Sequence, residues 1–115
     1  MQTITVNSMI TLNQGVTSEE GQPIYEAIIK FLKEGEVVTL DFEGVTFLTT
    51  AFLNVVIGTL YKDYSSEQLK DILKLKNVSP ETASRIKRVT DNAKSFYADQ
   101  ESFNQTVEEA MYGRM

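Results

Sequence analysis

The feature that most constrains the fold is an apolar, β-branched run at residues 37–42 (VVTLDF), directly after an amphipathic helical pattern. In that pattern the apolar side chains recur three or four residues apart, at Ile24, Ala27, Ile28, Phe31 and Leu32. Pro23 suits the first turn of this helix, and Gly35 suits a left-handed cap at its end. A strand as apolar as residues 37–42 is typical of the centre of a sheet whose two faces are both covered. The region therefore predicts a helix followed by a central strand.

Shorter patterns flank this unit. Apolar and polar residues alternate at 4–6 and again at 10–12, which predicts one interrupted strand or a short hairpin. Residues 45–48 form a short extended segment. Residues 51–61 are apolar nearly all round, which favours a buried helix, although their β-branched content is also compatible with a strand. Residues 73–76 (LKLK) alternate with lysines, as an exposed edge strand does.

Two more helices are expected in the C-terminal third. Ser79-Pro80-Glu81 has the residues of a helix start: a capping hydroxyl, a proline at the first position and an acid in the first turn. The apolar face of this helix is expected to be Ala83, Ile86, Val89, Ala93 and Phe96. A separate last helix is expected to carry Phe103, Val107, Ala110 and Met111. The order of elements predicts an α/β fold, a mixed β-sheet with about four helices packed against it. Residues 1–115 contain no linker and are expected to form a single domain.

Composition excludes several classes of function. The 115 residues include no His and no Cys, so thiolate or imidazole metal sites, disulfides and Ser-His or Cys-His nucleophiles are impossible. We expect no cofactor and no catalytic or metal-binding residues of these kinds; only an oxygen-ligated hard cation stays open. The net charge of −5 argues against nucleic-acid binding. No apolar run is long enough to span a membrane and no leader opens the chain, so a cytoplasmic protein is expected.

The hydroxyl pair Thr49-Thr50 stands where the extended segment gives way to the buried helix. A helix start offers free N–H groups and the positive end of the helix dipole, which together favour a phosphate. Phosphorylation would add about −1.5 to −2 charges that an apolar partner surface would not accept. The alternative is that one of the two threonines is simply an N-cap. One residue can serve both purposes.

Two blocks of the sequence resemble STAS domains, the sulphate transporter and anti-sigma factor antagonist family. Residues 37–50 resemble that family's apolar strand, which ends in an acid and leads to a hydroxyl-rich helix start. Residues 73–81 resemble its later strand, which runs into a Ser-Pro-Glu helix. With the spacing between the blocks, the resemblance covers about residues 24–96. It is strongest to the bacterial STAS-like proteins of unknown function, in which the hydroxyls are followed by Phe.

The resemblance implies a non-enzymatic regulatory module that binds a protein partner. In anti-sigma factor antagonists, a histidine-kinase-like ATPase phosphorylates a Ser or Thr at the start of the second helix. On this sequence Thr50 falls at the acceptor place, with Thr49 as the neighbouring candidate. Where those proteins have a preceding acid and a following glycine, this chain has Thr49 and Phe52. The residues expected to contact the partner, an anti-sigma-type kinase, are Asp41, Glu43, Phe52 and Asn54.

Other interpretations stay open at this point. The chain could be a small nucleotide- or cation-binding protein, or a weak enzyme, using Asp41, Glu43 and the two threonines. It could also be a structural subunit, which predicts an exposed apolar patch and self-association. A basic run is expected to be a solvated face, or else to meet an acidic partner or a phosphate: Lys74, Lys76, Arg85, Lys87 and Arg88. Three aromatic residues are expected in the core: Phe96, Tyr97 and Phe103.

Overall fold

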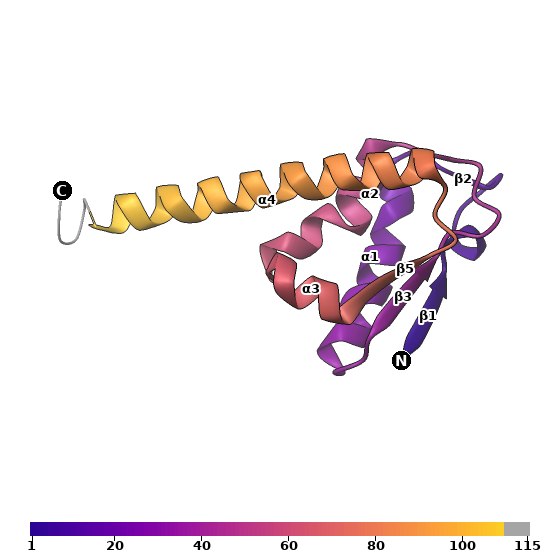
Figure 1. Ribbon diagram of the computed structural model, residues 1–115, viewed down its shortest axis with the longest axis horizontal. Helices are drawn as coiled ribbons and strands as arrows, with labels where there is room; N and C mark the ends of the chain where they lie inside the picture. Colours follow the sequence, from indigo (N-terminus) through magenta and orange to yellow (C-terminus); the bar gives the residue numbers. More distant parts are fainter. Residues whose placement is uncertain (110–115) are drawn as a thin grey trace.

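The computed structural model describes the backbone of residues 1–109 and the side chains of residues 1–97. The main sheet has three parallel strands in the order β1 (Gln2–Thr5), β3 (Val38–Asp41) and β5 (Leu73–Lys76). Two shorter strands, β2 (Gln14–Gly15) and β4 (Phe47–Leu48), form a second parallel pair. The α-helices of the described chain are α1 (Ser18–Lys33), α2 (Thr50–Val56), α3 (Ser66–Ile72) and α4 (Pro80–Glu109). The predicted α/β fold with four helices is confirmed (Figure 1).

The main sheet has one apolar and one polar face. Val38 and Leu40 of the central strand β3 are buried, and α1 contacts both β1 and β3. By strand alternation and register, the opposite face carries Thr3, Thr5, Thr39, Asp41, Lys74 and Lys76. Most of these polar residues are exposed. The prediction that residues 37–42 form a central strand is confirmed. The prediction that apolar elements cover both faces of this strand was wrong, because polar residues of all three strands share the second face.

The N-terminal segment is neither an interrupted strand nor a hairpin. It forms β1, a 3₁₀ turn η1 (Val6–Met9) and a loop that leads to β2. The antiparallel pairing within it is a single bridge between Thr11 and Gln14. The chain turns there through two residues with positive φ, Leu12 and Asn13, which break the alternation expected at 10–12.

Helix α1 begins earlier than the proline suggests. Thr17 is its N-cap and forms a reciprocal capping box with Glu20, so Pro23 is the sixth residue of the helix and not part of its first turn. The predicted apolar face is confirmed, since Ile24, Ile28 and Leu32 are buried. The helix ends before Gly35, which has a φ of +80° as expected for a left-handed cap.

The predicted buried helix is divided into two parts. Helix α2 ends at Val56, and the 3₁₀ helix η2 (Gly58–Lys62) continues the segment. Its buried residues form the centre of the core together with those of α1 and β3: Phe52, Leu53, Val56, Ile57 and Leu60. Helix α2 packs closely against α1 and also contacts α4. Its position is therefore fixed by two neighbouring helices.

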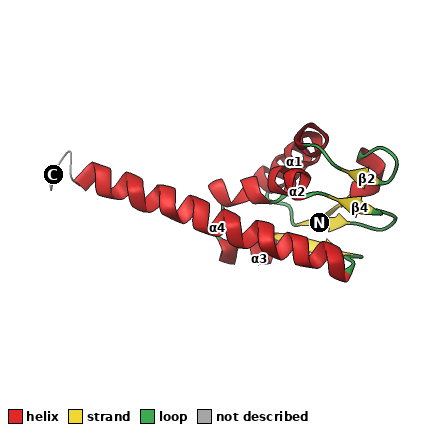
Figure 2. Ribbon diagram, turned by 90° about the horizontal axis from the view of Figure 1, so that it is seen from above, coloured by secondary structure: helices red, strands yellow, loops and turns green. Residues whose placement is uncertain are grey.

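Helix α4 is one continuous helix of 30 residues and not two. Ser79 caps its start, with the Oγ accepting a hydrogen bond from the Thr82 N–H at 3.1 Å, as predicted. The expected second helix was wrong because residues 97–109 contain no glycine or proline that would end the first. The side chains of Phe103 and Val107, and the whole of Ala110 and Met111, lie outside the described residues. Figure 2 shows α4 continuing well past the other elements.

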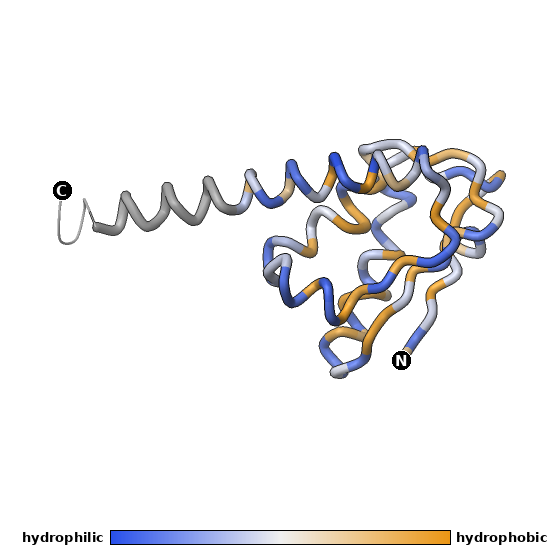
Figure 3. Tube along the Cα trace, viewed as in Figure 1, coloured by the Kyte–Doolittle hydropathy of each residue, from blue (hydrophilic) through white to orange (hydrophobic). Residues whose placement is uncertain are grey.

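Two predictions about individual side chains of α4 were also wrong. Ala83 is exposed, and Phe96 is 54% exposed rather than part of the core. The first half of the helix carries several hydrophilic positions (Figure 3). In the described part of the chain, no helix has the length and apolar character needed to cross a membrane.

Candidate functional site

The two threonines at the start of α2 have different environments. Thr49 is the N-cap: its Oγ1 accepts a hydrogen bond from the Phe52 N–H at 3.2 Å and donates one to the Val16 carbonyl. Thr50 is the first residue of the helix and is exposed. Among the described residues the Thr50 hydroxyl has no hydrogen-bond partner. The hydroxyl of Thr49 therefore stabilises the start of α2 and its contact with the segment before α1, whereas the hydroxyl of Thr50 is accessible.

The short β2–β4 pair fixes this junction in place. The Thr49 N–H donates to the Gly15 carbonyl at 3.0 Å, and the Thr46 N–H donates to the Asn13 carbonyl at 2.8 Å. Gly15 leaves no space for a side chain, because a Cβ there would lie 2.8 Å from the Phe52 ring. The loop before α1 thus packs directly on the start of α2.

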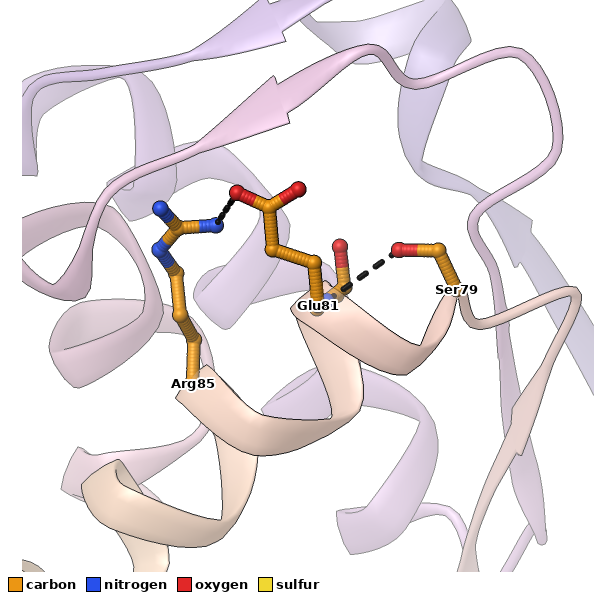
Figure 4. Close-up of polar contacts among 4 residues, drawn as sticks. Ser79, Glu81 and Arg85 are labelled. Carbon is orange, nitrogen blue, oxygen red and sulfur yellow. Dashed lines mark hydrogen bonds and ion pairs between the residues drawn. The ribbon is translucent and has the colours of Figure 1, made fainter.

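Thr50 lines a basic hollow whose other lining residues all belong to α4. Five residues line this hollow of about 340 Å³: Thr50, Glu81, Ser84, Arg85 and Arg88. One Arg85 Nη1–H donates to Glu81 Oε1 at 2.9 Å, one helical turn earlier (Figure 4). The same guanidinium lies 5.4 Å from the ring centroid of Phe47, the residue that begins β4. Arg88 forms no ion pair within the described part of the chain.

The basic run expected from the sequence does not act as one patch. Lys87 pairs with Asp91 at 2.8 Å on the same helix, which raises the lysine pKa and lowers that of the aspartate. The Lys74 Nζ donates to the Lys70 carbonyl on α3. Only Arg85 and Arg88 of this run line the hollow with Thr50. Two guanidinium groups beside an exposed hydroxyl are suited to receive a phosphate on that hydroxyl.

Asp41 organises a loop at the end of β3. Its Oδ1 accepts hydrogen bonds from the Asn77 side-chain amide at 2.8 Å and from the Glu43 N–H at 3.0 Å. These bonds, with that from Asn77 the stronger influence, lower the pKa of Asp41. Asn77 follows β5 with a φ of 57°, so the carboxylate joins the ends of two strands. Glu43 is exposed. The described residues contain no cluster of three or more potential metal-ligating acids.

The other expected partner-binding residues do not share one surface. Phe52 is fully buried, with Gly15 packed against its ring, so the expected contact of this side chain with a partner was wrong. Asn54 is exposed but lines a different hollow, with Gly58 and Phe96 among its neighbours. The contact between Arg85 and Phe47 was not predictable from the sequence, because the two residues are far apart along the chain and neither belongs to a motif.

The sequence model of one protein family, described as STAS-like domain of unknown function (DUF4325), matches residues 20–83, more than half of the chain. The chain belongs to this family. The matched segment of the STAS-like domain runs from the first turn of α1 to the first turn of α4. It includes Thr49, Thr50 and Glu81, whereas Arg85 and Arg88 follow it. No curated protein and no solved structure matches the chain.

Proposed function

We propose that this STAS-like domain is a non-enzymatic regulatory module, which binds a protein partner through the surface around Thr50 and is switched by phosphorylation of that residue. STAS-like domains are generally non-enzymatic, and membership in the family suggests a regulatory role. The observation that carries the proposal is the basic hollow, in which an exposed threonine hydroxyl shares one depression with two arginines of another helix.

The difference between the two threonines supports Thr50 as the acceptor. A kinase must reach the hydroxyl oxygen and leave a bulky, charged group there. On Thr49 this would remove both the N-cap and the hydrogen bond to the Val16 carbonyl. On Thr50 it would disturb no hydrogen bond within the described residues.

The arginines give the modification a structural consequence. In the unmodified chain, Glu81 occupies one N–H of Arg85. A phosphate on Thr50 carries more charge than that carboxylate and competes for the same guanidinium, with Arg88 as a second ligand. Modification would thus change the charge of the surface from basic to acidic without unfolding α2. A partner that docks on the unmodified surface would be released.

The partner we propose is a histidine-kinase-like ATPase of the anti-sigma type, which would both bind and phosphorylate the domain. The test is to incubate the full chain with ATP and a kinase-like ATPase encoded beside it, and to locate any phosphate by mass spectrometry. We expect one phosphate, on Thr50. Binding should survive Thr50→Ala and be lost with Thr50→Glu.

The control is Ser84→Ala, which removes the other hydroxyl of the hollow. Labelling should persist in this variant and vanish in Thr50→Ala. Phosphate on Ser84 alone, or binding indifferent to both Thr50 substitutions, would contradict the proposal.

A second candidate function uses the same arginines. A small nucleotide-binding protein would bind the phosphates of its ligand between Arg85 and Arg88, since Asp41 is engaged in its own loop. A thermal-shift screen with nucleotides and divalent cations tests this, because a ligand that prefers the folded state raises the melting temperature. Stabilisation by ATP that disappears in Arg88→Ala would favour this function over the phosphorylation switch.

A further inference from the structure

Strand β1 leaves one edge of the main sheet open. The strand order is β1, β3 and β5, so β1 pairs with β3 on one side and with no strand of the described chain on the other (Figure 1). In the parallel register with β3, the Gln2 N–H donates to the Val37 carbonyl at 2.8 Å. Backbone groups alternate in direction along a strand, so those of Ile4 also point toward β3. Those of Thr3 and Thr5 point toward the open edge.

Three backbone groups of β1 have no hydrogen-bond partner among the described residues. They are the N–H and the carbonyl of Thr3 and the N–H of Thr5. The remaining group at this edge, the Thr5 carbonyl, accepts a hydrogen bond from the Ser8 hydroxyl at 2.7 Å. Thr3 and Thr5 are both exposed. An exposed edge with unpaired N–H and carbonyl groups is a template for a further strand.

The pattern of free groups at this edge is complementary to itself in an antiparallel pair. When Thr3 of one copy lies opposite Thr3 of another, each Thr3 N–H donates to the Thr3 carbonyl of the other copy. In the same register Thr5 lies opposite Met1, so each Thr5 N–H donates to a Met1 carbonyl. These four hydrogen bonds use all three free groups of each β1. The two groups left over are already bound within each copy, the Thr5 carbonyl by Ser8 and the Met1 amino group by the Glu36 carboxylate.

The segment around this edge has the composition of an interface. Residues 1–18 contain no charged side chain, although 23% of the chain is charged. Met1 is 78% exposed, and Met9, in the turn η1 that follows β1, is 38% exposed. The antiparallel register brings Met1 of one copy to the end of β1 in the other, where this turn begins. Depletion of charge together with exposed methionine is typical of the core of an interface, and two copies meet there without like charges from these residues.

We infer that the chain forms a twofold dimer in which two β1 strands pair antiparallel, with Thr3 on the axis, and join two three-stranded sheets into one of six strands. The interface is isologous, because the same groups serve both copies. It is short, so the dimer is expected to dissociate on dilution. It lies on β1 and does not depend on the function proposed for Thr50.

The first test is the mass of the full chain in solution by sedimentation equilibrium, for the wild type and for Thr5→Pro. Thr5 has a φ of −82°, close to the value that proline requires, and its N–H faces the open edge. Proline therefore removes a donor of the interface and no hydrogen bond of the domain. Loss of two of the four hydrogen bonds should weaken the dimer at least about tenfold. Thr5→Val is the matched control, because it keeps the N–H, and it should dimerise as the wild type does. Circular dichroism verifies that both variants fold.

The second test is the register, for which the absence of cysteine is an advantage. In the dimer the two Thr3 Cα atoms lie about 5.5 Å apart, within the range of a disulfide, so Thr3→Cys should oxidise to a covalent dimer. Thr39→Cys is the control, because Thr39 lies beside Thr3 on the same face but on the central strand. Its two copies would be three strand spacings apart, about 14 Å, and should not cross-link.

Three results would overturn the inference. The first is a wild-type chain that is monomeric at all attainable concentrations. The second is a dimer that Thr5→Pro leaves intact, and the third is equal cross-linking at positions 3 and 39.

Discussion

The guanidinium group of Arg85 lies between the carboxylate of Glu81, 2.9 Å away, and the ring of Phe47, whose centroid is 5.4 Å away. The contact joins α4 to Phe47 of β4, which stands two residues before Thr49, the N-cap of α2. Arg85 is thereby held beside Thr50 by one charged and one aromatic neighbour. Both are weak restraints at an exposed site, so a stronger anion can recruit the side chain.

Phosphorylation of Thr50 should stabilise the domain, and the arginines should be the reason. We expect the free energy of unfolding to rise by about 1 kcal/mol, the scale of charge-assisted hydrogen bonds at a partly exposed site. In the Arg85→Ala/Arg88→Ala double variant the gain should vanish. Urea denaturation of modified and unmodified chains measures both. Lys87→Ala is the control, because Lys87 pairs with Asp91 and does not line the hollow; it should keep the gain.

Substitution of the two threonines by valine should separate capping from accessibility. Thr49→Val removes the N-cap and the hydrogen bond to the Val16 carbonyl, and should cost about 1–2 kcal/mol of unfolding free energy. Thr50→Val keeps the shape of an exposed side chain and should change stability by less than about 0.5 kcal/mol. Equal losses from both variants would contradict the assignment of Thr49 as the cap.

Gly15→Ala should destabilise the junction by about 1–3 kcal/mol, as overpacking of a well-filled core does. The added methyl group would lie 2.8 Å from atoms of both Leu48 and Phe52. Gly58→Ala is the matched control, since its nearest neighbour would be 3.4 Å away, an ordinary contact. Thermal melts of the two variants should differ clearly, and a melt of Gly15→Ala like that of the wild type would show that Phe52 moves freely.

Asp41 should contribute to stability at neutral pH and lose that contribution in acid. Its pKa is lowered in the folded state by the hydrogen bonds from Asn77 and Glu43. The stabilisation is therefore complete well above the unfolded-state pKa of about 3.9, and is lost as pH falls from there through the lower folded-state value. Asp41→Asn should be less stable than wild type at pH 7, and the difference should shrink by pH 2.

Urea denaturation at the two pH values measures the effect of Asp41. Glu43→Gln is the control for the loss of one negative charge from the same loop, since the Glu43 carboxylate makes no hydrogen bond within the described residues. A constant difference between wild type and Asp41→Asn at both pH values would show that the carboxylate is not what holds the loop.

Elements with strong local signals were predictable from the sequence. Residues 37–42 are β-branched and apolar enough to form the central strand, and Ser79-Pro80-Glu81 starts α4 as its residues require. The position of Thr49-Thr50 at a helix start also follows from local chemistry, since a hydroxyl before an apolar run is a capping signal. The family resemblance, which the match to residues 20–83 confirms, rests on the same blocks.

Features that depend on contacts between distant segments were not predictable. Phe52 was expected to contact a partner, but its side chain is buried, and Gly15 lets the segment before α1 pack directly against the ring. Phe96 continues the apolar face of α4 and is nevertheless exposed, because the domain ends beneath it. The basic hollow is lined by residues of two helices, α2 and α4. Sequence periodicity within each helix does not predict which residues of the two helices lie next to each other. The helix start predicted from Pro23 was wrong for a local reason, because the capping box of Thr17 and Glu20 places the start of α1 earlier in the chain.

The lysines of β5 also limit how these molecules can aggregate. Strand β5 is an outer strand of the main sheet, and its Lys74 and Lys76 are exposed. A β5 strand of a neighbouring molecule would bring its own lysines against these two, so pairing of one β5 edge with another is electrostatically opposed. Edge-to-edge growth of the sheet through two β5 strands is therefore disfavoured.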